Sequence, residues 1–372
     1  MSFKTFLILT VFLFFAPALH AQKKDSSRIY SSGGEQFRFE VLTQQKDVVW
    51  GFDFLGDGRI IFTERGGALR IYDPKTKKVT GVQGAPKVWA DGQGGLLDIR
   101  VHPKDKNRIY LTYSEPIDNG ATTAFASATL SGSELTQFKK LFSAKDASSN
   151  EIHFGSRIEF DGAGHIFITV GDRNDRPKVQ DLKYHMGKIL RFNEDGTVPK
   201  DNPFVKTKGA QPEIWALGIR NAQGLVRHPI TGDLWSVEMG PRGGDEINVI
   251  KPGLNYGWPV ITYGREYWGP KIGEGERKAG MEQPVVYWVP SLSPSGTTIY
   301  NGDVFPKWKG NMFVGMLATT HLRRLTMDGQ KITNQEELLK DLSMRIRNVR
   351  PGPDGFIYLS TDDGKIARLV PR

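Results

Sequence analysis

A polar-glycine turn runs directly into an aliphatic and aromatic stretch in Asp57-Gly58-Arg59-Ile60-Ile61-Phe62. Glycine or asparagine supplies the positive φ of a tight hairpin turn, and the apolar run that follows is typical of a β-strand. Five further copies of this pattern occur, at residues 106–111, 163–168, 232–237, 309–314 and 354–359. Each copy predicts a turn followed by a buried strand.

The spacing of these six copies, several tens of residues, fits the repeat of a β-propeller blade. The 42 glycines and 21 prolines suit a fold rich in turns and long loops. We therefore predict an all-β fold, a six-bladed β-propeller with four-stranded antiparallel blades. Because neighbouring blades bury one another, residues 22–372 are expected to form a single domain. Only residues 180–190 and 334–342 have the pattern of a short helix.

The first 21 residues have the pattern of a secretory signal peptide. Lys4 precedes the apolar residues 6–15, and small residues lead to a cleavage site that we place after Ala21, with Ala18 as the alternative. The apolar run is too short to span a bilayer comfortably, so no stable membrane insertion is expected. The mature protein is therefore predicted to be periplasmic or secreted.

Composition narrows the chemistry further. The chain has no cysteine, which excludes disulfides and thiol catalysis. Its formal net charge is +9, but the basic residues are scattered among acidic ones, so no nucleic-acid partner is predicted. An ordinary basic surface explains this charge, and a modest preference for anionic ligands is the alternative.

His153 and Asp172 flank the hairpin that contains the third turn. Antiparallel pairing about residues 163–164 brings both side chains toward the same end of the predicted blade. A histidine oriented by a carboxylate is the usual form of a general base near neutral pH. A purely structural His–Asp pair fits the spacing as well.

Two arginine motifs precede predicted strands. Arg220 stands beside Asn221, and together they offer a bidentate fork and an amide to a carboxylate or quinone oxygen. Arg345 and Arg347 are two residues apart, so in a strand both side chains point to one face as a cationic pair. A solvated strand face is the alternative for that pair.

Residues 240–248 combine glycine and proline carbonyls with two adjacent carboxylates, Asp245 and Glu246. Oxygen-only ligands of this kind suit Ca²⁺, although the spacing is not that of an EF-hand. The alternative is a turn with solvated acids. Tyr256 lies close behind in the sequence and is placed to add a carbonyl or an aromatic wall, while Gln93 lies on a glycine-rich loop before the second predicted blade.

Taken in order, these segments resemble the soluble quinoprotein glucose/sorbosone dehydrogenase family. The likeness is strongest to its short periplasmic aldose sugar dehydrogenases, which use pyrroloquinoline quinone (PQQ). It runs from about Val41 to the C-terminus, and its specific motifs are residues 215–224, 240–248 and 255–259. The resemblance implies a PQQ- and Ca²⁺-dependent oxidoreductase with an aldose substrate and an external electron acceptor.

The resemblance also implies a role for each candidate residue. His153 matches the base that removes the anomeric hydroxyl proton, Asp172 matches its orienting carboxylate, and Arg220 matches a residue near the reactive quinone oxygens. Gln93 matches a glutamine of the sugar site near the quinone. The remaining matches are to PQQ contacts at Asn221, Arg345 and Arg347 and to calcium ligands at Gly240, Pro241, Glu246 and Tyr256, the last two for a second, structural ion.

The implied chemistry is oxidation of an aldose at its anomeric carbon to a lactone. A neutral histidine takes the hydroxyl proton, PQQ accepts a hydride, and Ca²⁺ with an arginine stabilises the negative charge on the quinone. Two other functions fit the same scaffold. One is a non-catalytic secreted binding module, and the other is a calcium-dependent lactonase, which leaves Arg345 and Arg347 without a role.

Two positions depart from the family pattern. Ala318 stands where the family usually has a lysine that reaches a PQQ carboxylate, and the candidates to replace that lysine are Thr319, Thr320, His321 and Arg323. Met239 stands where a polar residue is expected. The first departure puts the strength of PQQ binding in question, and neither changes the base.

Overall fold

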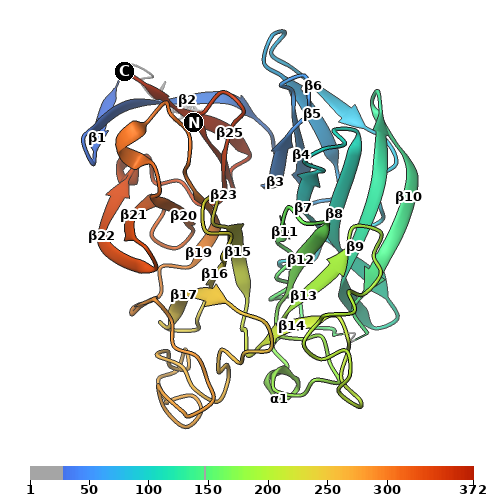
Figure 1. Cartoon of the computed structure of the whole chain (residues 1–372). Helices are drawn as coiled ribbons and strands as arrows, with labels where there is room; N and C mark the ends of the chain where they lie inside the picture. Colours follow the sequence, from blue (N-terminus) through green and yellow to red (C-terminus); the bar gives the residue numbers. More distant parts are fainter. Residues whose placement is uncertain (1–27, 146–147) are drawn as a thin grey trace, which may run out of the picture.

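The computed structural model describes residues 28–145 and 148–372, so the predicted signal peptide lies outside the described residues. The strands form six antiparallel sheets arranged around a centre, which confirms the six-bladed β-propeller (Figure 1). No helix within the described ranges is long and apolar enough to cross a membrane.

The blades follow one another along the chain. The first two contain β3 (Val49–Phe54), β4 (Ile60–Glu64), β5 (Leu69–Asp73) and β6 (Lys78–Val82), then β7 (Leu96–Val101), β8 (Arg108–Ile117), β9 (Gly120–Ser131) and β10 (Glu134–Ser143). The next two contain β11 (Ile158–Phe160), β12 (His165–Val170), β13 (Lys188–Asn193) and β14 (Ile214–Leu217), then β15 (Ala222–Arg227), β16 (Leu234–Glu238), β17 (Asp245–Ile250) and β18 (Val286–Trp288). The fifth contains β19 (Pro294–Ile299), β20 (Met312–Met316), β21 (Leu322–Asp328) and β22 (Lys331–Leu338).

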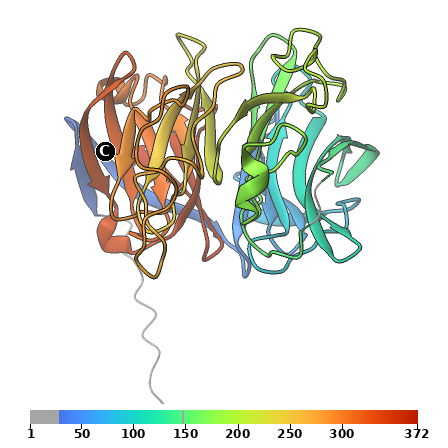
Figure 2. The same ribbon diagram turned by 90° about the horizontal axis from the view of Figure 1, so that it is seen from below.

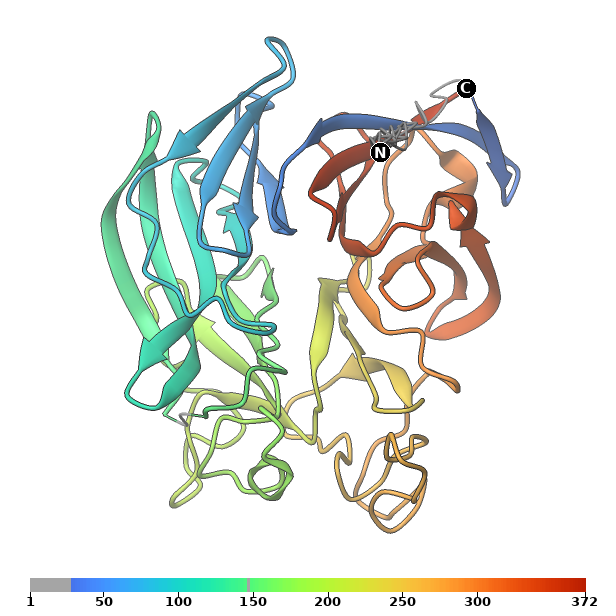
Figure 3. The same ribbon diagram turned by 180° about the vertical axis from the view of Figure 1, so that it is seen from behind.

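The last blade joins the two ends of the described chain. Its strands are β23 (Ile346–Pro351), β24 (Ile357–Thr361), β25 (Lys365–Pro371), β2 (Glu35–Gln44) and β1 (Ile29–Ser32). Phe37 of β2 is opposite Pro371 of β25, and the two strands lie side by side in blue and red (Figure 3). Five blades have the predicted four strands, while β1 adds a fifth strand to this one. Closure by an N-terminal strand leaves the ring without an open gap.

The core lies between neighbouring blades. Ile61 and Ile71 of the first blade pack in one buried cluster with Ile99 and Leu111 of the second. These β-branched and aliphatic side chains are buried only because the adjacent sheet covers them. Each of these two blades therefore depends on the other for part of its core.

All six predicted turns connect the first strand of a blade to its second strand. Gly58, Gly164 and Gly355 in these turns have φ of 86°, 99° and 81°, a region that a side chain with a β-carbon rarely adopts. The turns therefore gather at one face of the ring, which Figure 2 shows from its side. The first strands begin, and the second strands end, at the opposite face.

Both predicted helices are wrong. Residues 180–187 form turns that lead into β13, residues 188–190 already belong to that strand, and the described helix nearby is the short α1 (Arg176–Val179). Residues 334–342 continue β22 and end in the 3₁₀ helix η2 (Lys340–Leu342). The cross-strand partner of Glu336 is Arg324, and this ion pair with its β21 neighbour outweighs the local helical pattern. A second 3₁₀ helix, η1 (Pro306–Trp308), lies between β19 and β20.

Candidate active site

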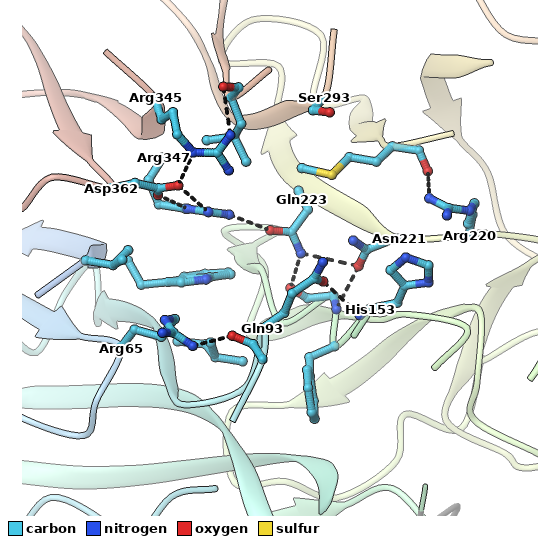
Figure 4. A pocket seen from close by; sticks show the side chains of 18 of the residues that line it. Arg65, Gln93, His153, Arg220, Asn221, Gln223, Ser293, Arg345, Arg347 and Asp362 are labelled. Carbon is cyan, nitrogen blue, oxygen red and sulfur yellow. Dashed lines mark hydrogen bonds and ion pairs between the residues drawn. The ribbon is translucent and has the colours of Figure 1, made fainter. Parts of the chain in front are cut away.

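A cavity of about 390 Å³ lies at the face where the first strands begin. Every blade contributes to it: its lining includes the residues just before β3, β7, β11, β15, β19 and β23 and just after β4, β16, β20 and β24. Figure 4 shows these side chains converging from opposite sides. The lining carries four arginines, namely Arg65, Arg220, Arg345 and Arg347, against the single carboxylate of Asp362. Such a surplus of fixed positive charge favours an anionic ligand.

His153 and Asp172 meet as the hairpin predicts. Their Nδ1 and Oδ1 atoms are 2.7 Å apart, and both side chains are buried. The two backbone segments approach closely here, since a β-carbon on Gly171 would lie 2.1 Å from the His153 carbonyl oxygen. Gln93 reaches the same place, because its Oε1 accepts the His153 N–H at 2.9 Å. The third blade and the loop before the second blade therefore fix the imidazole together.

Trp258 completes the support of this pair. Its Nε1 donates to Asp172 Oδ2 at 2.7 Å, while Oδ1 also accepts the Asn174 N–H at 2.8 Å. Asp172 thus receives a hydrogen bond on each oxygen besides the one from His153. A carboxylate held by three donors stays ionised and cannot rotate.

The two pKa values are shifted in compatible directions. Burial lowers the pKa of His153 below its usual range, and the charges of Arg220 and Arg173 add to this, while Asp172 opposes it only partly. Burial opposes ionisation of Asp172, but the hydrogen bond and charge of His153 and the charge of Arg220 outweigh it and hold its pKa low. At neutral pH the aspartate is therefore charged and accepts the Nδ1 proton, which leaves Nε2 of a neutral imidazole as the basic nitrogen.

Arg220 and Asn221 lie on the opposite side of the cavity opening from Arg345 (Figure 4). Arg220 Nη1 donates to the carbonyls of Met239 and Gly240, both at 2.9 Å, and its buried Nε has no partner among the described residues. Asn221 Oδ1 accepts from the Gly155 N–H at 3.1 Å. Arg220 is thus held in place beside the cavity by two main-chain carbonyls.

Arg345 and Arg347 share a face, as their spacing predicts, and both line the cavity. Arg347 makes a two-point ion pair with Asp362, at 2.7 and 3.0 Å, and Arg345 Nε lies 2.8 Å from the same carboxylate. Burial opposes ionisation of Asp362, but the two guanidinium groups hold its pKa below the usual range. One carboxylate thus orients two cations, and their combined charge stays positive.

The loop at residues 240–248 is buried rather than solvated, which overturns the alternative of exposed acids. Asp245 accepts the Gly240 N–H at 2.8 Å and the Leu292 N–H at 2.6 Å, so both of its carboxylate oxygens bind main-chain N–H groups of the protein. Glu246 lies close to Glu238, and burial followed by the mutual repulsion of the pair raises its pKa. In the described part of the chain, no three His, Cys, Asp or Glu side chains form a metal cluster.

A small cavity of about 10 Å³ lies beside these two glutamates. Asn248 donates to both carboxylates, at 3.4 Å for Glu238 and 3.1 Å for Glu246, while its buried Oδ1 has no partner in the described ranges. Tyr256 lies differently, because its hydroxyl donates to the Val249 carbonyl at 2.7 Å and accepts from the Lys251 amide. Of Tyr256, only the carbonyl remains for a metal.

The sequence motifs include Gln223, Glu238 and Trp258 without giving any of them a role of its own, and Arg65 and Asp362 were missed altogether. Arg65 and Asp362 directly follow the second strands of their blades, so the repeat could have located them. Trp258 lies in the motif at residues 255–259, but its contact with Asp172 could not be read from the sequence, since the two residues are 86 positions apart.

The departures from the family pattern at Met239 and Ala318 leave the arginines of the cavity in place. Met239 lines the cavity, and its carbonyl rather than its side chain holds Arg220. Ala318 is exposed next to Leu317, a lining residue. Arg323 does not replace the lysine, because it is paired with Glu337 at 2.9 Å and Gln335 at 3.0 Å on β22.

Known proteins share both the sequence and the fold. The sequence model of the Glucose / Sorbosone dehydrogenase family matches residues 46–368. Aldose sugar dehydrogenase YliI of Escherichia coli (strain K12) is 44% identical over 343 residues, 90% of this chain and 92% of the relative.

Two solved structures extend the likeness. The apo form of the soluble aldose sugar dehydrogenase from Escherichia coli has a TM-score of 0.88 at 43% identity, and covers 90% of this chain and 100% of its own. The PQQ-bound aldose sugar dehydrogenase from Streptomyces coelicolor has a TM-score of 0.75 at 25% identity, and covers 92% and 99%. By sequence and by fold, the chain belongs to the glucose/sorbosone dehydrogenase family.

Proposed function

We propose that this protein oxidises aldose sugars at the anomeric carbon to lactones, with PQQ and Ca²⁺ as cofactors. The observation that carries the proposal is the His153–Asp172 pair, which places a neutral imidazole at an arginine-rich cavity. The names of the relatives, which are aldose sugar dehydrogenases, support a sugar substrate and an oxidoreductase activity.

The chain's own residues supply the proton transfer. Nε2 of His153 takes the proton of the anomeric hydroxyl, and Asp172 stabilises the imidazolium that forms through the Nδ1 hydrogen bond. Gln93 and Trp258 keep both partners in place, so the base needs no reorganisation when the sugar arrives. Loss of the hydroxyl proton raises the electron density on the anomeric carbon and prepares it to lose a hydride.

The residues of the cavity fit PQQ. Arg345, Arg347 and Arg220 line it and are placed to hold the carboxylates and quinone oxygens of PQQ. The quinone, when bound, accepts the hydride. A PQQ-bound relative with the same fold supports this assignment.

The oxygen atoms near Glu246 fit a calcium ion. Glu238 and Glu246 line a space of about 10 Å³, roughly one water or ion in size, and Asn248, which donates to both carboxylates, has a buried Oδ1 without a partner among the described residues. The Gly240 and Pro241 carbonyls are the ligands proposed for the ion that accompanies PQQ, and Gly240 borders both the large and the small cavity. Glu246 and the Tyr256 carbonyl are proposed for the second ion, with Glu238 and Asn248 as additional oxygen donors.

Reconstitution tests the proposed function directly. The purified chain is incubated with PQQ and Ca²⁺, and dye reduction is followed with glucose and other aldoses. We expect PQQ-dependent dye reduction with lactone as the product. Absence of oxidation with intact PQQ binding would favour a non-catalytic binding module, and lactone hydrolysis without PQQ would favour the lactonase.

Calcium removal is expected to release PQQ and to lower the melting temperature. At a Ca²⁺ concentration of 100 times Kd, binding stabilises the fold by about 2.7 kcal/mol. The Glu246→Gln variant tests whether Glu246 binds Ca²⁺ or only repels Glu238. If Ca²⁺ binds there, the variant melts lower than wild type in Ca²⁺, and a chelator lowers its melting temperature by less than it lowers that of wild type. Without a metal, the variant loses only the repulsion with Glu238 and melts higher, which would remove calcium from this site.

Ala318→Lys is expected to tighten PQQ binding about five- to thirtyfold, since a charge-assisted bond contributes roughly 1.5 to 3 kcal/mol before the cost of ordering the side chain. We expect this gain because Arg323 is already paired with Glu337 and because Ala318 is next to Leu317, which lines the cavity. Titration of both apo proteins with PQQ at fixed Ca²⁺ measures the effect. Equal or weaker binding by the variant would mean that another group, such as Arg345, already holds that carboxylate.

We also propose that residues 1–21 direct export and are removed. Mass spectrometry of protein recovered from the periplasm or medium is expected to find Gln22 as the first residue. An intact N-terminus in that fraction would refute cleavage.

A further inference from the structure

A buried arginine that the proposed proton transfer does not use lies beside the His153–Asp172 pair. Arg173 directly follows Asp172, is 1% exposed and does not belong to the cavity lining. Its φ is 49°, a left-handed conformation that residues with a side chain rarely adopt. Burying a guanidinium group costs free energy unless its donors are bound, so the contacts of Arg173 indicate what it holds in place.

The donors of Arg173 bind main-chain carbonyls of the second blade and of the segment at residues 150–153. Nη1 donates to the Ala121 carbonyl on β9 at 2.8 Å, and Nε donates to the Ile152 carbonyl at 3.0 Å. Nη2 donates to the Asn150 carbonyl. The planar guanidinium group thus joins β9 to the segment that ends at His153.

Gln93 holds the same segment through the residues in between. Its N–H donates to the Glu151 carbonyl at 2.7 Å, and its Oε1 accepts the His153 N–H at 2.9 Å, so Gln93 and His153 lie together at the cavity (Figure 4). Arg173 therefore binds residues 150 and 152, and Gln93 binds residues 151 and 153. Two residues from the loops of different blades fix the main chain just before the imidazole.

The backbone of His153 depends on such support. Its φ is 59°, and residues other than glycine keep a left-handed conformation only where their surroundings impose it. A change of φ redirects the Cα–Cβ bond and moves Nε2 with it. The contacts that hold the main chain at residues 150–153 therefore also set the position of the imidazole.

Arg173 acts on His153 through its charge as well. Burial lowers the pKa of Arg173 to about 10, against the opposing charge of Asp172, so the group is still a cation at neutral pH. The charged groups that act on the imidazole are Asp172 and Arg173 from the loop after β12 and Arg220 from the loop before β15. Both arginines oppose protonation of His153.

We propose that Arg173 is a positioning residue for the proton transfer, because together with Gln93 it holds residues 150–153 and so fixes Nε2 of His153 at the cavity. The inference rests on the proposed role of His153 as the base. A general base has to be held within about 0.5 Å of its productive position, so loss of this support slows the chemical step and leaves cofactor binding intact. The alternative is that Arg173 contributes to fold stability alone.

The kinetic test compares Arg173→Met with Arg191→Met in enzyme reconstituted with PQQ and Ca²⁺. Arg191 is a matched control, because it is 6% exposed and pairs with Asp201 in the same blade, outside the cavity lining. In Arg173→Met we expect single-turnover reduction of bound PQQ by glucose to slow about 10- to 100-fold, with PQQ affinity unchanged. The rate stays at the wild-type value in Arg191→Met. A wild-type rate in Arg173→Met overturns the inference.

Two measurements without sugar separate this inference from the proposed function. Hydrogen exchange of the His153 amide reports the hold on the main chain, and an NMR titration reports protonation of the His153 imidazole. In Arg173→Met we expect the amide to exchange about 10- to 150-fold faster, because hydrogen bonds to a charged group are lost. We expect the imidazole to titrate at higher pH, because a neighbouring positive charge is gone. If wild type oxidises no aldose but both changes occur, the proposed function fails and the positioning role stands.

Arg173→Lys separates the charge from the hold on the main chain, and it is the milder change if Arg173→Met does not fold. Lysine keeps the positive charge but lacks the planar fork that binds several carbonyls. We expect its His153 imidazole to titrate as in wild type, while the His153 amide exchanges faster and the single-turnover rate falls. Wild-type exchange and rate in both variants, with only a lower melting temperature, would assign Arg173 to fold stability and overturn the inference.

Discussion

We expect His153→Gln to lower kcat for aldose oxidation about 10²- to 10⁴-fold, the usual effect of removing a positioned general base. Glutamine retains a polar group near Asp172 but has no basic nitrogen to accept the anomeric proton. Folding and PQQ binding are expected to stay near wild type. The measurement is single-turnover reduction of bound PQQ by glucose, with melting temperature and PQQ titration as checks on the protein.

His165→Gln is the matched control for this experiment. His165 forms a similar pair with Asp161, 2.6 Å between Nδ1 and Oδ2, in the same hairpin but outside the cavity lining. It is expected to keep the wild-type rate. Oxidation by His153→Gln within a few-fold of wild type would show that His153 is not the base.

The pH dependence follows from the direction of the His153 shift. Burial holds the pKa of His153 below its ordinary value of 6.5, so the imidazole is neutral and competent at pH 7. Protonation removes the base only when the pH falls through that lowered pKa. We therefore expect kcat/KM in wild type to decline on the acid side below pH 6.5. A decline centred above 6.5 would contradict the assigned environment.

The second large effect is expected at the paired arginines. Arg347→Met is expected to weaken PQQ binding about 10- to 150-fold, since a hydrogen bond to a charged group contributes roughly 1.5 to 3 kcal/mol. The loss is increased because Asp362 then has only Arg345 as an ion-pair partner and repels an anionic ligand. Titration of the apo protein with PQQ at fixed Ca²⁺ gives the dissociation constant.

Two variants sharpen the interpretation of that result. Arg347→Met with Asp362→Asn is expected to recover part of the affinity, because the uncompensated carboxylate is gone. Arg323→Met removes a guanidinium that is bound to β22 and is expected to leave PQQ binding unchanged. Wild-type affinity in Arg347→Met would exclude this pair from the cofactor site.

The sequence was most informative where neighbouring residues allow only a few backbone conformations. A turn such as Asp57-Gly58 needs positive φ, and an apolar run after it has to be buried, so six copies were sufficient to predict the blades. The same repeat predicts that His153 and Asp172 lie at one end of a hairpin. Arg65 and Asp362 follow the second strands of their blades, and the same rule extended to these positions would have identified them.

Local pattern failed where cross-strand contacts dominate. Residues 334–342 have a helical pattern by themselves, but Glu336 and Glu337 pair with Arg324 and Arg323 of the neighbouring strand. An ion-pair partner that lies on another strand is invisible to a propensity read along one segment. The fold was therefore predicted more accurately than the individual elements outside the hairpins.

The sequence alone thus determined the six blades, the His153–Asp172 pairing and the cationic motifs, because short-range turn geometry and strand alternation govern all three. Only the tertiary structure decided what surrounds them. Packing of the loops of the third and fourth blades brings Trp258 to Asp172 and joins Arg176 to Glu266. These contacts join segments that are distant in sequence, and burial and charge act through space, so no local pattern along the chain records them.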